Sequence, residues 1–92
     1  MSPGEGALRL DKWLWRARFI RNRDLAEGLV AARRVRVNEQ LVGKTHQLIR
    51  PGDVITLTEP ARVWVVRVRA LGERRGPAVE ARLLYEEITR LE

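Results

Sequence analysis

The sequence contains no cysteine and only one histidine, so its fold cannot depend on disulfide bonds. With 92 residues it has room for one small domain, and hydrophobic residues make up 45% of the chain, which is enough for a core. The missing thiols exclude a disulfide framework and cysteine-ligated zinc, and a single histidine excludes multi-histidine metal sites. We therefore expect a folded domain that holds no metal and no cofactor.

The hydrophobic pattern changes from a helical repeat to strand-like alternation about a third of the way along the chain. Two helices are predicted, one over 8–20 with Asp11 as its N-cap and one from Asn22, as its cap, to about Ala32. Short runs that follow predict strands at 35–38, 41–42, 48–49, 54–57 and 63–71. This order predicts an α+β fold, with two N-terminal helices packed on a small, mostly antiparallel sheet and a short C-terminal helix or extension.

Individual side chains and turns can be assigned within this outline. Leu25, Leu29 and Ala32 are predicted to line the inner face of the second helix. A turn is expected at Glu39–Gln40. The segment 50–53 fits a type II turn, with proline at its second and glycine at its third position.

Composition divides the chain into three parts. Residues 1–7 contain one proline and two glycines and are expected to form a flexible tail. Residues 8–71 are expected to form the main domain. Residues 72–92 are expected to form a basic loop and a C-terminal extension that packs on this domain through Val79, Leu83 and Ile88.

The positive charge is concentrated in one half of the chain. Between Arg9 and Arg50 the sequence has eleven basic and four acidic residues, whereas the remainder has seven basic and eight acidic residues. The whole chain carries a net charge of +6, so all of the excess lies in one contiguous segment. A basic half beside a neutral half indicates a surface for a polyanion, and nucleic acid is the first candidate.

Residues suited to catalysis are sparse. The sequence has no glycine-rich phosphate loop and no nucleophile elbow, and His46 lacks the partners of a catalytic triad. We interpret the adjacent Glu86 and Glu87 as a solvated end or as counter-charges for arginines rather than as an acid/base pair, because neighbouring carboxylates point in different directions. No signal peptide and no run of roughly 20 apolar residues is evident. We expect a non-enzymatic, cytoplasmic protein with no membrane contact and no small-molecule substrate.

The aromatic side chains have two interpretations. Trp15 and Phe19 are four residues apart beside Lys12, which suits a ridge that stacks on exposed bases. The alternative is that both rings cover the core of a domain too small to expose them. Trp13 and Trp64 are assigned to the core.

Four segments, taken in order, resemble the alpha-L RNA-binding motif, a small module named after a ribosomal small-subunit protein. They are Arg9–Trp15, Asn22-Arg23-x-x-Ala26, Val35-x-Val37-Asn38 and Pro51-Gly52-Asp53-x-Ile55. With Arg74–Ala78 and Leu83–Glu87 added, the chain is most similar to the bacterial ribosome-associated fifteen-kilodalton heat-shock proteins. This resemblance implies an RNA-binding domain over 8–71. It also implies binding to ribosomal RNA and the large subunit, in the heat-shock-linked rescue of large subunits that retain a nascent chain on tRNA.

The resemblance also implies where the RNA binds. It places the basic face at Arg9, Lys12, Arg23, Arg34, Arg36 and Asn38. Charge and position add Arg16, Arg21, Arg33 and Lys44. The family has glycine at the positions of Arg33 and Glu39, so both residues are expected to need a left-handed backbone.

Other functions remain open at this point. The chain could serve as the RNA-targeting accessory subunit of an RNA-modifying enzyme, or as an adaptor whose basic face meets an acidic protein. Weak DNA binding is also expected, because a basic face attracts any polyanion at low salt.

Overall fold

The computed structural model describes residues 6–88, so residues 1–5 of the predicted tail lie outside the described part of the chain. The helices are α1 (Leu10–Arg16), α2 (Asp24–Ala31), α3 (Ala78–Ala81) and a 3₁₀-helix over Arg82–Leu84. The strands are β1 (Leu8–Arg9), β2 (Val35–Val37), β3 (Gln40–Leu41), β4 (Leu48–Ile49), β5 (Val54–Glu59), β6 (Arg62–Val68) and β7 (Tyr85–Glu87).

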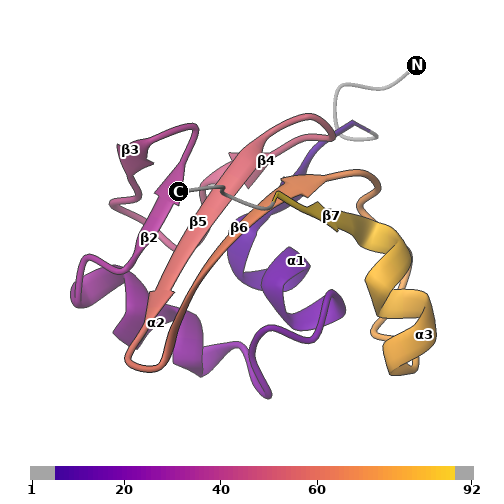
Figure 1. Cartoon of the computed structure of the whole chain (residues 1–92), viewed down its shortest axis with the longest axis horizontal. Coiled ribbons are helices and arrows are strands. Elements are labelled where there is room, and N and C mark those ends of the chain that lie inside the picture. The colour runs from indigo at the N-terminus through magenta and orange to yellow at the C-terminus, as the bar shows by residue number, and fades with distance from the viewer. Residues whose placement is uncertain (1–5, 89–92) are drawn as a thin grey trace.

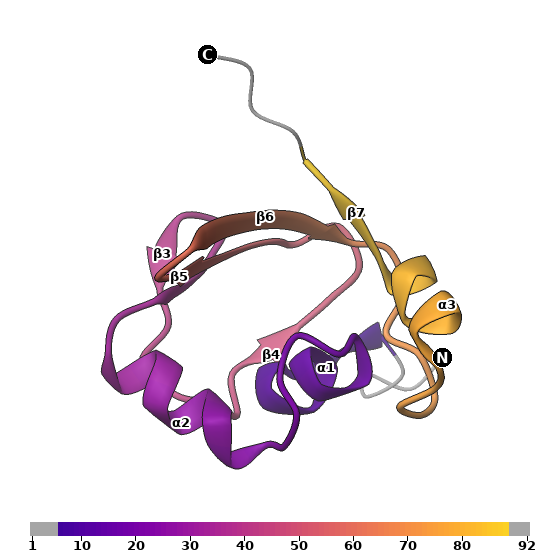
Figure 2. The ribbon, with the colours of Figure 1, turned by 60° about the horizontal axis from the view of Figure 1, so that its bottom comes forward.

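The strands form an antiparallel sheet in the order β3-β2-β5-β6-β7, and β1 pairs separately with β4 (Figure 1). Both α1 and α2 lie on one side of the large sheet, whereas no helix formed by residues 6–88 lies on its other side (Figure 2). The predicted α+β fold is therefore confirmed. The long pair β5–β6 forms the centre of the sheet, and the alternation predicted for 63–71 is present, since Val66 and Val68 face the core.

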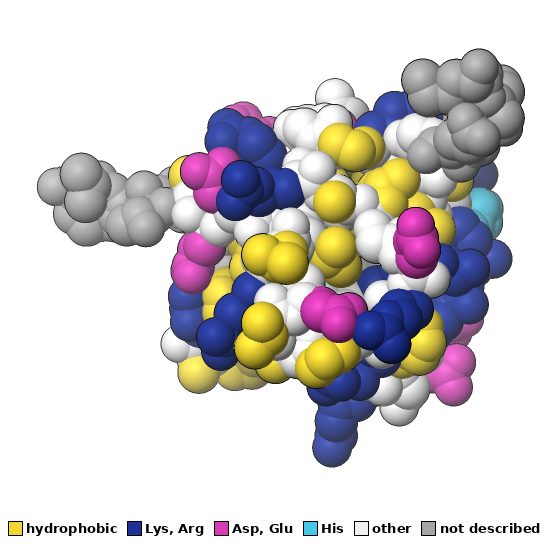
Figure 3. Space-filling view, turned by 90° about the vertical axis from the view of Figure 1, so that its right-hand side faces the viewer, with side chains coloured by type: hydrophobic (Ala, Val, Ile, Leu, Met, Phe, Trp, Pro, Cys, Tyr) yellow, Lys and Arg dark blue, Asp and Glu magenta, His cyan; other side chains and the backbone are white. Residues whose placement is uncertain are grey.

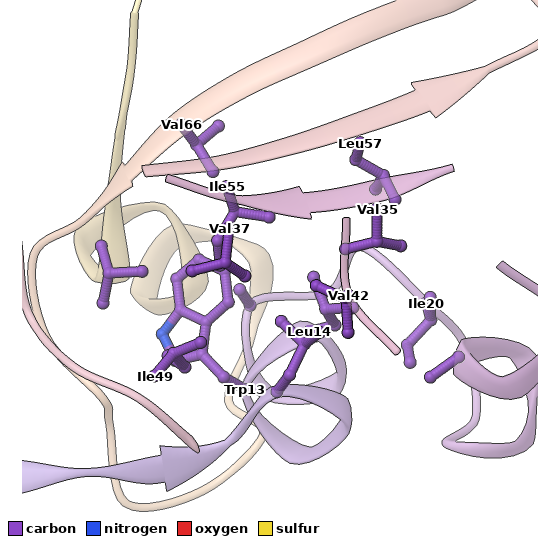
Figure 4. Close-up of a cluster of buried hydrophobic side chains, with 14 residues drawn as sticks. Trp13, Leu14, Ile20, Val35, Val37, Val42, Ile49, Ile55, Leu57 and Val66 are labelled. Carbon is purple, nitrogen blue, oxygen red and sulfur yellow. The ribbon is translucent and has the colours of Figure 1, made fainter. Parts of the chain in front are cut away.

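The core lies between this sheet and the two N-terminal helices. Trp13 and Leu14 of α1 pack against Val37, Ile55 and Val66 of the sheet (Figure 4). Each large side chain buried here contributes on the order of 1.5–3 kcal/mol relative to an exposed one. The indole nitrogen of Trp13 keeps a hydrogen bond, because it donates to the carbonyl of Ala70 at 2.9 Å.

The first helix begins at Leu10, two residues later than predicted. Leu8 and Arg9 pair with β4 instead, and the amides of Leu10 and Asp11 donate to the carbonyls of Gln47 and Thr45 at 2.8 and 3.1 Å. Asp11 therefore lies inside the first turn, and its prediction as N-cap was wrong. Backbone carbonyls from the loop before β4 accept hydrogen bonds from the free amides of the first helical turn. A capping side chain would otherwise accept these bonds.

The second helix turns a different face inward from the one predicted. Asn22 acts as a cap, since its Oδ1 accepts a hydrogen bond from the Leu25 amide at 3.2 Å. The buried residue is Ala26, and Leu29 and Val30 pack partly on the core, whereas Leu25 and Ala32 are exposed. A small side chain at the contact lets a short helix approach the core closely, so Leu25 and Ala32 were assigned wrongly.

Two turns contain residues with a left-handed backbone. In the 50–53 turn the Asp53 amide donates to the Arg50 carbonyl at 3.0 Å and Gly52 has φ 99°, which confirms the predicted type II geometry. The β2–β3 hairpin turns at Asn38 and Glu39, one residue earlier than predicted, with φ values of 51° and 72°. Two successive left-handed residues are the pattern of a two-residue hairpin turn.

The C-terminal segment packs through residues other than those predicted. Val79 and Leu83 are 72% and 68% exposed, whereas Ala81 is buried and Leu84 and Tyr85 pack against the core. The reason is that α3 ends after one turn and the chain continues as a 3₁₀-helix and then as β7, which changes the face presented to the domain.

The acidic pair at the end of the described chain has one of the two roles predicted for it. Glu86 and Glu87 form ion pairs with Arg67 and Arg62 of the neighbouring strand β6. Of the three hydrophobic residues expected to pack back, Ile88 is partly buried, and its amide donates to the carbonyl of Val65 at 2.7 Å.

Candidate nucleic-acid interface

A carboxylate joins two arginines from different parts of the chain. Asp11 Oδ2 lies 2.9 Å from Arg9 Nη2, and Arg9 Nε donates to Asp11 Oδ1 at 3.1 Å. Arg23 Nη2 approaches the same two oxygens at 3.5 and 3.4 Å. Arg9 ends β1 and Arg23 immediately precedes α2, so the shared carboxylate draws together residues that are 14 positions apart.

The environment of Asp11 keeps its carboxylate charged. Burial of the group works to raise its pKa. The hydrogen bond from Arg9, the positive charges of Arg23 and Arg9, and the Lys12 amide together outweigh burial and hold the pKa of Asp11 below its usual value of 3.8. At neutral pH the site therefore contains one buried negative charge between two positive charges.

Three further basic residues of the predicted set line an adjoining hollow or are close to the cluster in sequence. A polar surface hollow is lined by Arg9, Asp11, Arg23, Asp24, Glu27 and Thr45. A second hollow shares Glu27 and Thr45 with the first and is lined by Lys44. Lys12 follows in the first turn of α1, and Arg21 is exposed in the segment between α1 and α2.

Arg36 lies on the opposite side of the sheet from this cluster. It is exposed, whereas its neighbours Val35 and Val37 are buried against the helices, because successive side chains of a strand alternate between its faces. Its Nη1 donates to the carbonyl of Glu39 at 3.1 Å. The predicted site residues therefore occupy two sides of the molecule rather than one continuous face.

The junction between α2 and β2 connects these two sides. Arg33 is exposed with φ 61°, which confirms the left-handed backbone expected there, and the carbonyl of Arg34 accepts a hydrogen bond from the Thr58 amide at 2.9 Å. Within residues 6–88, no acidic side chain forms an ion pair with Arg33, Arg34 or Arg36. Their charges are thus uncompensated by direct pairing inside this part of the chain.

Asn38 has its side chain engaged in the fold. Its Oδ1 accepts a hydrogen bond from the Val54 amide at 2.9 Å, and its Nδ2 donates to Asp53 Oδ1 at 3.1 Å. These bonds fix the hairpin turn against the start of β5.

Arg16 points away from the cluster, toward the 72–77 loop. Its Nη1 donates to the carbonyl of Gly72 at 2.6 Å. Arg18 donates to the carbonyl of Gly76 at 2.6 Å, and Arg75 of the loop donates back to the carbonyl of Trp15 at 3.0 Å. The sequence analysis missed these contacts, since arginines that bind backbone carbonyls carry no spacing signal.

The aromatic side chains favour the core interpretation. The ring of Phe19 lies 4.8 Å from that of Tyr85 and 5.4 Å from that of Trp64, between centroids. Trp15 is partly buried beneath Arg75.

Figure 3, which looks at the side carrying α3, shows hydrophobic side chains near the centre and lysine and arginine side chains gathered toward the borders.

Residues 6–88 contain neither a membrane-spanning helix nor a metal-binding cluster. No helix among them is both long and apolar enough to cross a membrane. Among the same residues, no group of three histidine, cysteine, aspartate or glutamate side chains is placed to hold a metal ion.

The part of the chain that carries this geometry matches a known family model. The S4 domain matches residues 8–55, which contain α1, α2, the β2–β3 hairpin and β4. This match covers more than half of the chain, which is therefore an S4-domain protein.

Individual relatives narrow this assignment. Heat shock protein 15 of Escherichia coli is 41% identical over 80 residues, which cover 87% of this chain and 59% of the relative. A heat shock protein 15 homolog of Haemophilus influenzae is 35% identical over 83 residues, which cover 90% of this chain and 63% of the relative. The trimeric structure of Vibrio cholerae heat shock protein 15 matches with a TM-score of 0.82 at 35% identity, covering 89% of this chain and 82% of that one. The chain belongs to the heat shock protein 15 family, and the resemblance found in the sequence is confirmed.

The chain spans less than two thirds of the length of the two curated relatives.

Proposed function

We propose that this chain binds structured RNA without catalysing a reaction on it, and that its target is ribosomal RNA of the large subunit. The observation that carries the proposal is the pair Arg9 and Arg23, whose guanidinium groups lie at the surface beside one carboxylate. Guanidinium groups bind phosphate oxygens through paired, charge-assisted hydrogen bonds. Membership in the S4 domain family supports an RNA partner.

We assign the contacts to both sides of the molecule, joined across the α2–β2 junction. Beside the helices they are Arg9, Lys12, Arg21, Arg23 and Lys44, at the junction Arg33 and Arg34, and on the hairpin Arg36 and Asn38. Arg16 contributes through its charge, because Gly72 occupies its Nη1. In this proposal residues 8–71 form the RNA-binding domain, and residues 72–92 form a basic loop and an extension that packs on it.

We further propose that the protein acts in the cytoplasm, in the heat-shock-linked rescue of large subunits that carry a nascent chain on tRNA. The names of its relatives support a role under heat stress. The tRNA on such a subunit is then a second RNA partner. Binding to DNA is expected to be weak, because phosphate contacts alone give low affinity at physiological salt.

Sedimentation tests this function directly. A tagged copy of the chain is followed through a sucrose gradient of cell lysate, before and after heat shock and with or without nuclease. We expect a peak with the large subunit that grows after heating and that nuclease abolishes. Protein that stays at the top of the gradient at low salt would remove the ribosome from the proposal. A partner that survives nuclease would instead indicate an enzyme subunit or a protein adaptor.

A further inference from the structure

A buried negative charge lies directly under the arginines that the proposed function assigns to phosphate. Asp11 is 5% exposed, whereas the side chains of Arg9 and Arg23 are 49% and 40% exposed. A carboxylate at this place repels RNA, and Asp24 and Glu27 line the same hollow. Among the described residues, however, Asp11 alone of these three forms ion pairs with the two arginines. All three side chains are acidic, so charge alone does not explain why Asp11 is the one that contacts both arginines.

The backbone holds Asp11 in one place. Its amide donates to the carbonyl of Thr45 at 3.1 Å, and its Oδ1 accepts the Lys12 amide at 2.8 Å. The loop before β4 thus fixes the backbone of Asp11, and the first turn of α1 fixes its carboxylate. A side chain anchored in this way can restrict the two long arginines that contact it.

The contacts leave donors available to a ligand. Arg9 uses its Nε and Nη2 on Asp11, and Arg23 uses only its Nη2. Arginine carries five N–H donors in a planar group. The Nη1 group of Arg9 and the Nε and Nη1 groups of Arg23 therefore make no hydrogen bond to any other residue from 6 to 88.

We propose that Asp11 is a positioning residue of the RNA interface, which holds Arg9 and Arg23 together so that their remaining donors take one RNA phosphate group. The proposal rests on the proposed function. An arginine that is ordered before binding does not lose its rotamer entropy in the complex, whereas a free side chain loses it when it binds. Asp11 repels the RNA locally, but it also orders the two arginines before the RNA binds.

Removal of a single negative charge from the hollow at two different places tests the proposal. Asp11→Asn and Glu27→Gln each raise the net charge by one, but only Asp11 contacts the arginines. Binding to a large-subunit RNA fragment is measured by fluorescence anisotropy over a range of salt concentrations. We expect Glu27→Gln to tighten binding roughly two- to fivefold, because it removes a repulsion. We expect Asp11→Asn to weaken binding on the order of tenfold and to reduce the log–log salt slope by roughly 0.7–0.9, the value for one lost phosphate contact.

A second pair of variants keeps the test decisive if Asp11→Asn does not fold. Arg9→Lys and Arg23→Lys keep the charge but lose the planar group that spans the carboxylate and a phosphate. We expect each to weaken binding severalfold, with thermal melts that match the wild type. If Asp11→Asn folds and binds as tightly as Glu27→Gln, or if both lysine variants bind like the wild type, the positioning role is wrong. A wild-type chain that does not bind the RNA overturns the proposed function itself.

Discussion

Arg75 lies across Trp15, with its guanidinium carbon 5.8 Å from the ring centroid and its Nε donating to the Trp15 carbonyl at 3.0 Å. Its Nη2 also reaches the carbonyl of Ile20 at 3.4 Å. One side chain of the 72–77 loop therefore binds α1 and the segment that follows it.

Removal of this contact is expected to destabilise the domain. Arg75→Ala leaves two carbonyls without a charged donor, and we expect the free energy of unfolding to fall by about 1.5–3 kcal/mol. The measurement is urea unfolding followed by circular dichroism. Arg74→Ala is the control, because the exposed ion pair of Arg74 with Glu80 is worth roughly 0–1 kcal/mol. Equal losses from the two variants would show that the loop is not anchored through Arg75.

The charge of Asp11 is expected to make stability depend on pH. Because the pKa of Asp11 is lower in the folded chain, the folded state favours the ionised form. This contribution is fully present above the unfolded-state value, near 3.8, and is lost as the pH falls through the lower folded pKa. We therefore expect Asp11→Asn to be less stable than the wild type at pH 7, with a difference that shrinks below about pH 4. Thermal melts of both proteins between pH 7 and pH 2 measure it, and a difference that stays constant across this range contradicts the prediction.

The left-handed residues are expected to be sites where glycine stabilises the chain. Arg33 and Glu39 have φ values of 61° and 72°, and a non-glycine residue there costs on the order of 1–2 kcal/mol. We expect Arg33→Gly and Glu39→Gly each to raise the free energy of unfolding by about 1 kcal/mol, after the greater flexibility of glycine in the unfolded chain is subtracted. Gly52→Ala, at φ 99°, is the reverse control and should lower stability. Chemical unfolding measures all three variants.

Arg36 tests whether RNA reaches the side of the sheet that carries no helix. If it contacts a phosphate, Arg36→Ala should reduce the log–log salt slope of RNA binding by roughly 0.7–0.9. Arg67→Ala is the matched control, since Arg67 is also exposed on a strand of this sheet but is paired with Glu86. Salt titrations of RNA binding distinguish the two variants. An unchanged slope for Arg36→Ala would confine the interface to the helix side.

Local patterns were enough to predict the elements whose shape depends on neighbouring residues. The alternation of β6 and the type II turn at 50–53 follow from short-range sterics. The left-handed conformation at Arg33 was expected from the glycine that the resembling family has at this position. For Glu86 and Glu87 the sequence left two interpretations open, and the ion pairs favour the counter-charge role. The order of helices and strands was sufficient to predict the fold class.

The wrong predictions concern features set by residues distant in the sequence. The start of α1 depends on carbonyls of Thr45 and Gln47, which no pattern around Leu10 can reveal. The hydrogen bond from Arg16 to the carbonyl of Gly72 likewise joins residues far apart in the sequence, whereas the proposed role of Arg16 in RNA binding stays a prediction. The side of the sheet on which Arg36 lies could be assigned only once the pairing of β2 in the sheet was known.

The hydrogen bond from the Trp13 indole to Ala70 joins residues separated by 57 positions, and the Arg75–Trp15 bond joins residues separated by 60. During synthesis the ribosome makes α1 early but completes the partners of Trp13 and Trp15 near the other end of the sequence. The contacts that hold α1 therefore form only after β6 and the 72–77 loop have emerged. We expect folding of this small domain to be limited by the slow closure of these long loops rather than by its local helices.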